Sequence, residues 1–305
     1  MIKNFFLRKV SILIAALLLV ITLSFFLMRL LPGDPFAAEQ SMPKETLDSL
    51  HRYYGLDQPL LVQYQRYLFS ILRFDLGPSF KYTGRSVAAI ILESFPISLL
   101  LGIEAFILAL AGGVISGVVM AFYKGPLLKA LFKITLIVLL SVPAYLFATL
   151  LQYVLAIKLD LLPLARWGTF SHSILPALSL ALFPLAYIAR LFYAAIGETL
   201  KQDFIATIRA TGASEKEVIF KHILPNALMP VIAYCGPLLA TIFTGSFVIE
   251  KIFGIAGLGQ WLIVSIGNRD YPVIMGITIF YSFLLMSCNF IVDCVYQFCY
   301  PHLRQ

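Results

Sequence analysis

The chain has 305 residues, of which 60% are hydrophobic and only 13% are charged, and its net charge is +7. Soluble domains are usually about half apolar and about a quarter charged, so this composition excludes an ordinary soluble protein and indicates one packed bundle of membrane helices. The basic residues lie between apolar stretches, which is typical of topology signals rather than of a surface for nucleic acid.

Six apolar stretches are long enough to cross a bilayer as helices, which takes roughly 20 residues each. Pro143 falls in the third, and membrane helices tolerate such prolines because neighbouring groups satisfy the freed carbonyls. We therefore predict an all-α membrane protein with about six transmembrane helices. The predicted spans are Val10–Leu31, Pro96–Tyr123, Ala130–Ile157, Ser173–Ile196, Ala227–Ile249 and Pro272–Phe298.

The first stretch begins like a signal peptide, with Lys3, Arg8 and Lys9 ahead of the apolar run. The run is longer than the usual apolar region of such a peptide, and no A-x-A cleavage site precedes Arg29. We expect residues 1–31 to form a retained signal-anchor helix.

The distribution of basic residues predicts that both termini face the cytoplasm, because inner loops carry the excess of Lys and Arg. With the N-terminus inside, residues 32–95 form a long outer loop, residues 197–226 an inner loop, and Glu250–Tyr271 a second outer loop. A further short outer loop connects the third and fourth spans. These two short outer loops then hold only Lys158, Arg166, Lys251 and Arg269. The inner basic residues are Lys3, Arg8, Lys9, Lys124, Lys129, Lys133, Arg190, Lys201, Arg209, Lys216, Lys221 and Arg304.

The inner loop has the pattern of two short helices joined by a glycine turn. Gly212 separates the halves, and Ser214 with Glu217 fits the capping box that begins a helix. Short helices are marginal alone, so their apolar faces must lie on the bundle, on lipid headgroups or in a groove of another protein. The apolar positions at helical spacing are Leu200, Phe204, Ile205 and Ile208, and then Val218, Ile219 and Ile223.

This loop resembles the EAA loop of ABC importer permeases, whose pattern is E-A-A, three residues, Gly, nine residues and I-x-L-P. Gly212, Leu224 and Pro225 match at the right spacing, whereas Ala206-Thr207-Ile208 replaces the name-giving triplet and His222 replaces the isoleucine. Arg209-Ala210-Thr211-Gly212 is similar to the A-R-A-x-G run of the dipeptide/oligopeptide/nickel branch. Other stretches that resemble this branch are Leu31–Pro35, Gly55–Pro59, Asp75–Gly77, Gly257–Gly259 and Asn268–Pro272.

The resemblance implies a type I ABC importer permease bundle in the bacterial inner membrane, with a helical extracytoplasmic loop at 32–95 and a five-helix core at 96–305. In that family two related permeases pair, two ATP-binding subunits dock underneath, and an extracytoplasmic solute-binding protein delivers the substrate. Peptide is the substrate we expect, with nickel or another small solute as the alternative. The implied ATPase-coupling residues are Asp203, Ala206, Thr207, Arg209, Ala210, Thr211, Gly212, Glu215, Leu224 and Pro225.

The sequence assigns no catalytic residue, cofactor or metal site. It contains no G-x-x-x-x-G-K-S/T pattern, so we expect ATP hydrolysis in partner subunits, and its four histidines lie far apart. An ion-coupled secondary transporter would predict an internal repeat and paired midplane charges, and neither is evident. An intramembrane serine protease is disfavoured because Ser214 lies in the polar inner loop.

Three further features of the sequence stay open. Two of them have two interpretations each, and the third has no assigned role. Gly113 and Gly117 form a small-residue face for packing within the bundle, or else for contact with the partner permease. Glu104 lies within the second span and stays unassigned. We predict an amphipathic helix in the outer loop, which either caps the pore beneath the binding protein or lies on lipid; its residues include Gln63, Tyr64, Tyr67 and Phe69.

Overall fold

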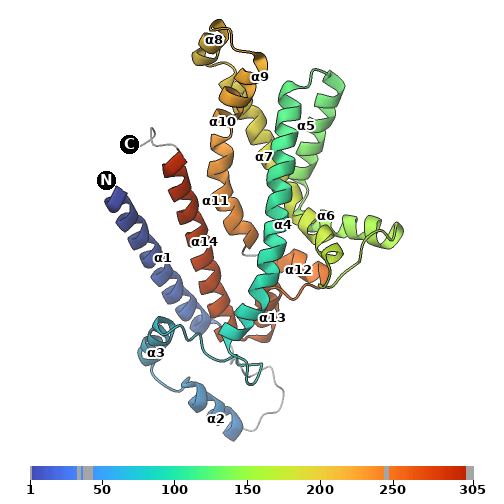
Figure 1. The fold of residues 1–305 in the computed structure, drawn as a ribbon. Helices are drawn as coiled ribbons and strands as arrows, with labels where there is room; N and C mark the ends of the chain where they lie inside the picture. The colour runs from blue at the N-terminus through green and yellow to red at the C-terminus, as the bar shows by residue number, and fades with distance from the viewer. Residues whose placement is uncertain (1, 33–35, 37–43, 244–246, 300–305) are drawn as a thin grey trace. The chain divides into compact units, whose positions relative to one another are not determined.

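The structure, a computed structural model, describes residues 2–32, 36, 44–243 and 247–299. These residues form helices without a β-strand, apart from one isolated bridge between Pro78 and Ser86, so the all-α prediction is confirmed (Figure 1). Two compact units can be distinguished. Unit 1 comprises residues 1–97 and 257–284, and unit 2 comprises residues 98–256 and 285–305.

Unit 1 is held together by aromatic packing between the first helix and the outer segments. Phe25 is buried against Tyr271 and stacks on Tyr67 at a centroid distance of 5.5 Å. The hydroxyls of Thr22 and Tyr64 share a hydrogen bond of 2.7 Å. The amphipathic outer-loop helix therefore packs its aromatic face on α1. The helices are α1 (Ile2–Leu30), α2 (Lys44–Tyr54), α3 (Leu60–Leu72), the start of α4 (Val87–Phe122), α13 (Leu258–Asn268) and the first part of α14 (Tyr271–Cys299).

Unit 2 is organised around α7, whose Ile188, Phe192 and Ile196 are buried in its main hydrophobic core. Besides the remainders of α4 and α14, it contains α5 (Pro126–Ser141), α6 (Ala144–Leu151), η1 (Gln152–Lys158), α7 (Phe170–Thr199), α8 (Asp203–Ala210), α9 (Glu215–Glu217), η2 (Val218–Ile223), α10 (Leu224–Ala227), α11 (Met229–Phe243) and α12 (Phe247–Phe253).

The glycine face of α4 lies directly against α7. A Cβ atom at Gly113 would come within 2.7 Å of Ile188 and 2.9 Å of the Leu185 carbonyl oxygen, and one at Gly117 would lie 3.1 Å from the Ala189 carbonyl oxygen. Only glycine allows the two backbones to approach this closely. Packing within the bundle, the first interpretation of this face, is confirmed.

The predicted spans need one correction in the middle of the chain. Among the residues that the structure describes, four helices, α1, α4, α7 and α14, are long and apolar enough to cross a membrane, and bent helix pairs raise the number to as many as seven. The third predicted span is not one straight helix, because α5 and the α6–η1 segment meet at 107°. Val142 is extended (ψ 128°) between them, as the residue before a proline prefers, and Pro143 donates no backbone hydrogen bond.

The segment predicted as the second outer loop is also largely helical. It contains the end of α12 and all of α13. Glu250, predicted at the start of this loop, is fully buried within α12 and accepts a hydrogen bond of 2.8 Å from the Ser98 hydroxyl. Three of the basic residues assigned to inner segments, Lys129, Lys133 and Arg190, lie inside α5 and α7.

Candidate functional site

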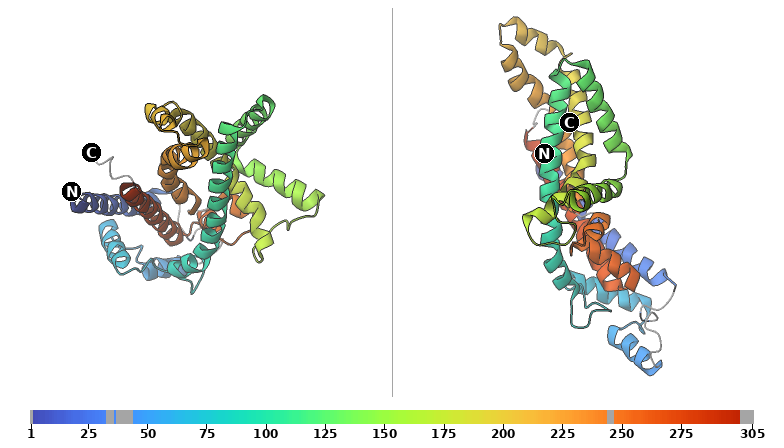
Figure 2. Two further views of the ribbon diagram at one scale, coloured as in Figure 1. Left: turned by 45° about the horizontal axis from the view of Figure 1, so that its top comes forward. Right: turned by 90° about the vertical axis from the view of Figure 1, so that its right-hand side faces the viewer.

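The predicted inner loop forms a compact projection at one end of unit 2. Residues 197–226 cover the end of α7, then α8, a turn at Gly212, α9, the π-helix η2 and the first part of α10. In Figures 1 and 2, α8 and α9 extend beyond the neighbouring ends of α4 and α5. The predicted order of helix, glycine turn and helix is confirmed.

The turn depends on the backbone conformation of Gly212. Its φ is +84°, in the left-handed region, and a Cβ atom placed there would meet nothing within 4 Å. A side chain at this position would therefore meet open space and would be disfavoured by the backbone alone. The glycine predicted from the loop pattern is required for the chain reversal.

The second helix begins with the predicted cap. Ser214 is the N-cap residue, and its hydroxyl accepts a hydrogen bond of 3.3 Å from the backbone N–H of Glu217. The Glu217 carboxylate in turn accepts a 2.6 Å bond from the ammonium of Lys221, one helical turn later. This hydrogen bond and charge lower the pKa of Glu217.

Arg209 and Glu215 fasten the two sides of the turn. The Arg209 Nε donates to one carboxylate oxygen of Glu215 at 2.9 Å, and Nη2 donates to the other at 3.2 Å. The bidentate geometry orients both side chains, although an exposed pair of this kind stabilises a fold by at most about 1 kcal/mol. The predicted contact of Arg209 with an ATPase stays a prediction, and in the isolated chain its guanidinium is partnered by Glu215.

The inner face of the projection is anchored in the core of unit 2. Ile205 of α8 and Val218 and Ile223 of η2 are almost fully buried, and they pack in the same cluster as Ile196 of α7. Burying one such side chain contributes about 1.5–3 kcal/mol relative to leaving it exposed. The loop is therefore fixed to the helix that precedes it.

The outer face of α8 is open and consists mainly of small side chains. Phe204 at one edge of this face is 37% exposed, and Phe220 on η2 is 69% exposed. An exposed face of small residues flanked by aromatic rings suits close contact with another protein. We call this surface the docking face; its small residues are Ala206, Thr207, Ala210 and Thr211, all exposed.

The return to the bundle passes through a local change of helix type. The π-helix η2 ends at Ile223, and Pro225 lies in the first turn of α10, where it needs no backbone donor. The Asn226 side chain donates a 2.7 Å bond to the carbonyl of His222, a group near this junction. Leu224 and Pro225 thus lie at the junction between η2 and α10, and their role at the re-entry into the membrane stays a prediction.

Sequence reasoning missed three polar pairings in unit 2, two of them in the projection. The Glu217–Lys221 bridge has the i, i+4 spacing that could have revealed it. The Arg209–Glu215 pair spans a turn, and Ser98–Glu250 joins residues far apart in the chain, so neither has a local signal. Glu104 is half-buried on α4, and the described residues include no cluster of metal-ligating side chains.

Comparison with known proteins gives concordant matches over the whole chain. Residues 113–305 match the family "Binding-protein-dependent transport system inner membrane component", and residues 1–102 match "Binding-prot-dependent transport system membrane comp, N-term". The dipeptide transport system permease protein DppB of Bacillus subtilis is 43% identical over 95% of this chain and 94% of its own length. The oligopeptide transport system permease protein OppB of Haemophilus influenzae is 39% identical over 100% of both chains.

Two solved structures share the fold at lower identity. A chain of the methionine ABC transporter MetNI, in an inward-facing conformation, superposes with a TM-score of 0.56 at 17% identity, covering 68% of this chain and 95% of that one. A chain of an amino acid ABC transporter crystallised with histidines gives a TM-score of 0.56 at 16% identity, with 69% and 94% covered.

Proposed function

The chain belongs to the family of inner-membrane components of binding-protein-dependent transport systems, and on this premise we propose that it carries peptides across the membrane as one permease of an ATP-driven importer. Whole-length identity of about two fifths to a dipeptide and an oligopeptide permease is the observation that supports this substrate class. Nickel or another small solute is the alternative that a transport assay must separate from peptide.

We further propose that the docking face couples this permease to a separate ATP-binding subunit. In this scheme α8 sits in a groove of the ATPase, and the buried contacts of Ile205, Val218 and Ile223 transmit its displacement to α7. The small exposed side chains leave room for a close approach, and the Arg209–Glu215 pair holds the turn in shape before docking.

The proposed assembly contains a second, related permease, two ATP-binding subunits and an extracytoplasmic solute-binding protein. The excess of basic residues in segments such as 197–226 supports the proposed cytoplasmic termini, and in this orientation the docking face is on the side where ATP is available. The sequence has no P-loop, which accords with hydrolysis in the partner subunits.

Co-purification with engineered variants tests the coupling proposal. The double substitution Ala206→Glu with Ala210→Glu places two charges on the docking face without touching the buried side. Lys124→Glu is the control, because it changes an exposed charge between α4 and α5 that is not part of the docking face. Tagged protein is extracted in mild detergent, cross-linked, and its partners are identified by mass spectrometry.

The expected result is that wild type and Lys124→Glu bring down an ATP-binding subunit and a second permease. The double variant loses the ATP-binding subunit and keeps the permease. Retention of the ATPase by the double variant at wild-type yield would refute the role of the docking face, and absence of any ATPase from wild type would refute the importer itself.

A further inference from the structure

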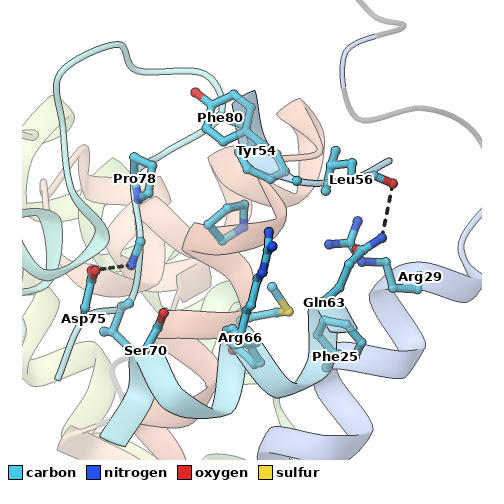
Figure 3. Close-up of a pocket in the computed structure, with 16 residues that line it drawn as sticks. Phe25, Arg29, Tyr54, Leu56, Gln63, Arg66, Ser70, Asp75, Pro78 and Phe80 are labelled. Carbon is cyan, nitrogen blue, oxygen red and sulfur yellow. Dashed lines mark hydrogen bonds between the residues drawn. The ribbon is translucent and has the colours of Figure 1, made fainter. Parts of the chain in front are cut away.

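Unit 1 contains a cavity of about 180 Å³ that the transport scheme does not use. It is lined by the last turns of α1, by α3, by the chain between Asp75 and Phe80, and by the start of α14 (Figure 3). A single water needs only roughly 10–15 Å³ of accessible space, so the cavity can hold a much larger polar group.

The charges of the cavity are separated. The side chains of Arg29 and Arg66 extend into it from α1 and α3, and Asp75 lies across it from Arg29 (Figure 3). Neither guanidinium forms a hydrogen bond or an ion pair with a residue that the structure describes, while one oxygen of Asp75 accepts a 2.9 Å bond from the N–H of Gly77. The Arg29 guanidinium lies over the Phe25 ring at 5.4 Å, but neither arginine is neutralised by a carboxylate among the described residues. Two such cationic groups lining one cavity favour an anion between them.

Two uncharged lining residues also keep unused polar atoms. The Gln63 amide nitrogen donates to the carbonyls of Gln58 at 2.7 Å and Leu56 at 3.1 Å, which fixes the amide and leaves its buried oxygen without a partner among the described residues. The buried hydroxyl of Tyr67 likewise has none there. Buried polar atoms are normally hydrogen-bonded, so these groups fit a ligand with both donors and acceptors.

The cavity lies at the level where membrane helices end. Arg29 is the penultimate residue of α1, and Pro272 is the second residue of α14. Helix ends of this kind lie in the layer of lipid headgroups. At the same end of α1, Leu30 is 77% exposed, and Leu27, on the side of the helix opposite Arg29, is 56% exposed, so this helix end presents apolar surface at the headgroup level.

From this layout we propose that the cavity binds the headgroup of an aminophospholipid, with its phosphate between Arg29 and Arg66 and its ammonium directed toward Asp75. A free zwitterion with the same charges, such as a short peptide, has the same polar chemistry. The lipid is favoured because the cavity lies at the level of helix ends, where α1 carries exposed leucines. Such a lipid would fix α3 to α1 and α14 within unit 1.

Lipid titration of the purified full-length chain, together with the subunits that co-purify, tests this proposal. Delipidated protein is titrated with phosphatidylethanolamine, phosphatidylglycerol or phosphatidylcholine, and bound lipid is counted by native mass spectrometry. The variants are Arg29→Gln with Arg66→Gln, and separately Asp75→Asn. Arg73→Gln is the matched control, since it removes an exposed arginine at the end of α3 that does not line the cavity.

The expected result is one tight phosphatidylethanolamine site in wild type and in Arg73→Gln. The double arginine variant binds it at least about tenfold more weakly, since charge-assisted hydrogen bonds to the phosphate are lost. The Asp75→Asn protein should bind all three lipids but lose its preference for the primary amine. This variant keeps the Gly77 hydrogen bond, so it reports on recognition even if the arginine variant folds poorly.

Equal affinity of wild type and both variants for phosphatidylethanolamine would overturn the proposal. Free phosphoethanolamine and a dipeptide are tested as competitors to identify the source of the zwitterion. Displacement of the lipid by a dipeptide at lower concentration than by phosphoethanolamine would assign the cavity to the peptide instead, and the lipid proposal would be wrong.

Discussion

The turn at Gly212 offers a prediction whose size follows from the structure. Gly212→Ala adds a side chain that meets no atom within 4 Å, so its cost is the left-handed backbone alone, about 1–2 kcal/mol for an ordinary residue. A change of this size shifts a local equilibrium by roughly 5–30-fold. Amide hydrogen exchange in Ala213–Glu217 should accelerate by this factor in the detergent-solubilised full chain, as measured by mass spectrometry.

Gly197 supplies the matched control for this experiment. It also has open space around its Cα, but it lies inside α7 with an ordinary helical φ. Alanine is favoured over glycine in a helix by about 0.8–1 kcal/mol, so Gly197→Ala should leave exchange in the loop unchanged or slower. Equal acceleration in both variants would refute the reasoning from positive φ, and Gly212→Asn should fall between alanine and wild type because Asn tolerates this region.

Other predictions concern single contacts. Gly113→Ala places a Cβ atom 2.7 Å from Ile188, so overpacking of α4 on α7 should destabilise the fold by about 1–3 kcal/mol, seen as a lower midpoint of thermal unfolding. The N–H of Phe80 donates a 3.0 Å hydrogen bond to the buried carboxylate of Asp270, and Asp270→Leu removes this acceptor. The substitution should lower the stability of the fold by about 1–3 kcal/mol and accelerate amide exchange in residues 79–86. The pKa of Glu217 is lower in the fold than in the unfolded chain, so its ionised carboxylate stabilises the fold at pH values above the unfolded pKa. This stabilisation is lost as the pH falls through the lowered value. Glu217→Gln should abolish that acidic dependence of loop exchange.

Features that depend on short stretches of sequence could be predicted. The reversal at Gly212 and the cap at Ser214 are set by residues within three positions of each other, and both occur as expected. The packing of Gly113 was also foreseen, because small residues at helical spacing have few uses in a membrane helix other than close approach.

Features that depend on distant partners could not be predicted. Pro143 is visible in the sequence, but a proline can kink a membrane helix slightly or break it, and only the packing around it produces the 107° bend. Glu250 looked like a loop residue because its partner Ser98 lies 152 positions earlier. The cavity at Arg29 and Arg66 likewise requires α1 and α3 to be brought together, which no local pattern specifies.

Uptake by reconstituted proteoliposomes tests the central claim most directly. The co-purified complex is inserted into liposomes with its solute-binding protein, and the uptake of a radiolabelled dipeptide, a labelled oligopeptide and labelled nickel is followed with ATP or with an imposed ion gradient. The account predicts that ATP alone drives peptide uptake, and that Ala206→Glu with Ala210→Glu abolishes it while Lys124→Glu does not. Uptake driven by the ion gradient without ATP, or uptake of nickel but not of peptide, would contradict it.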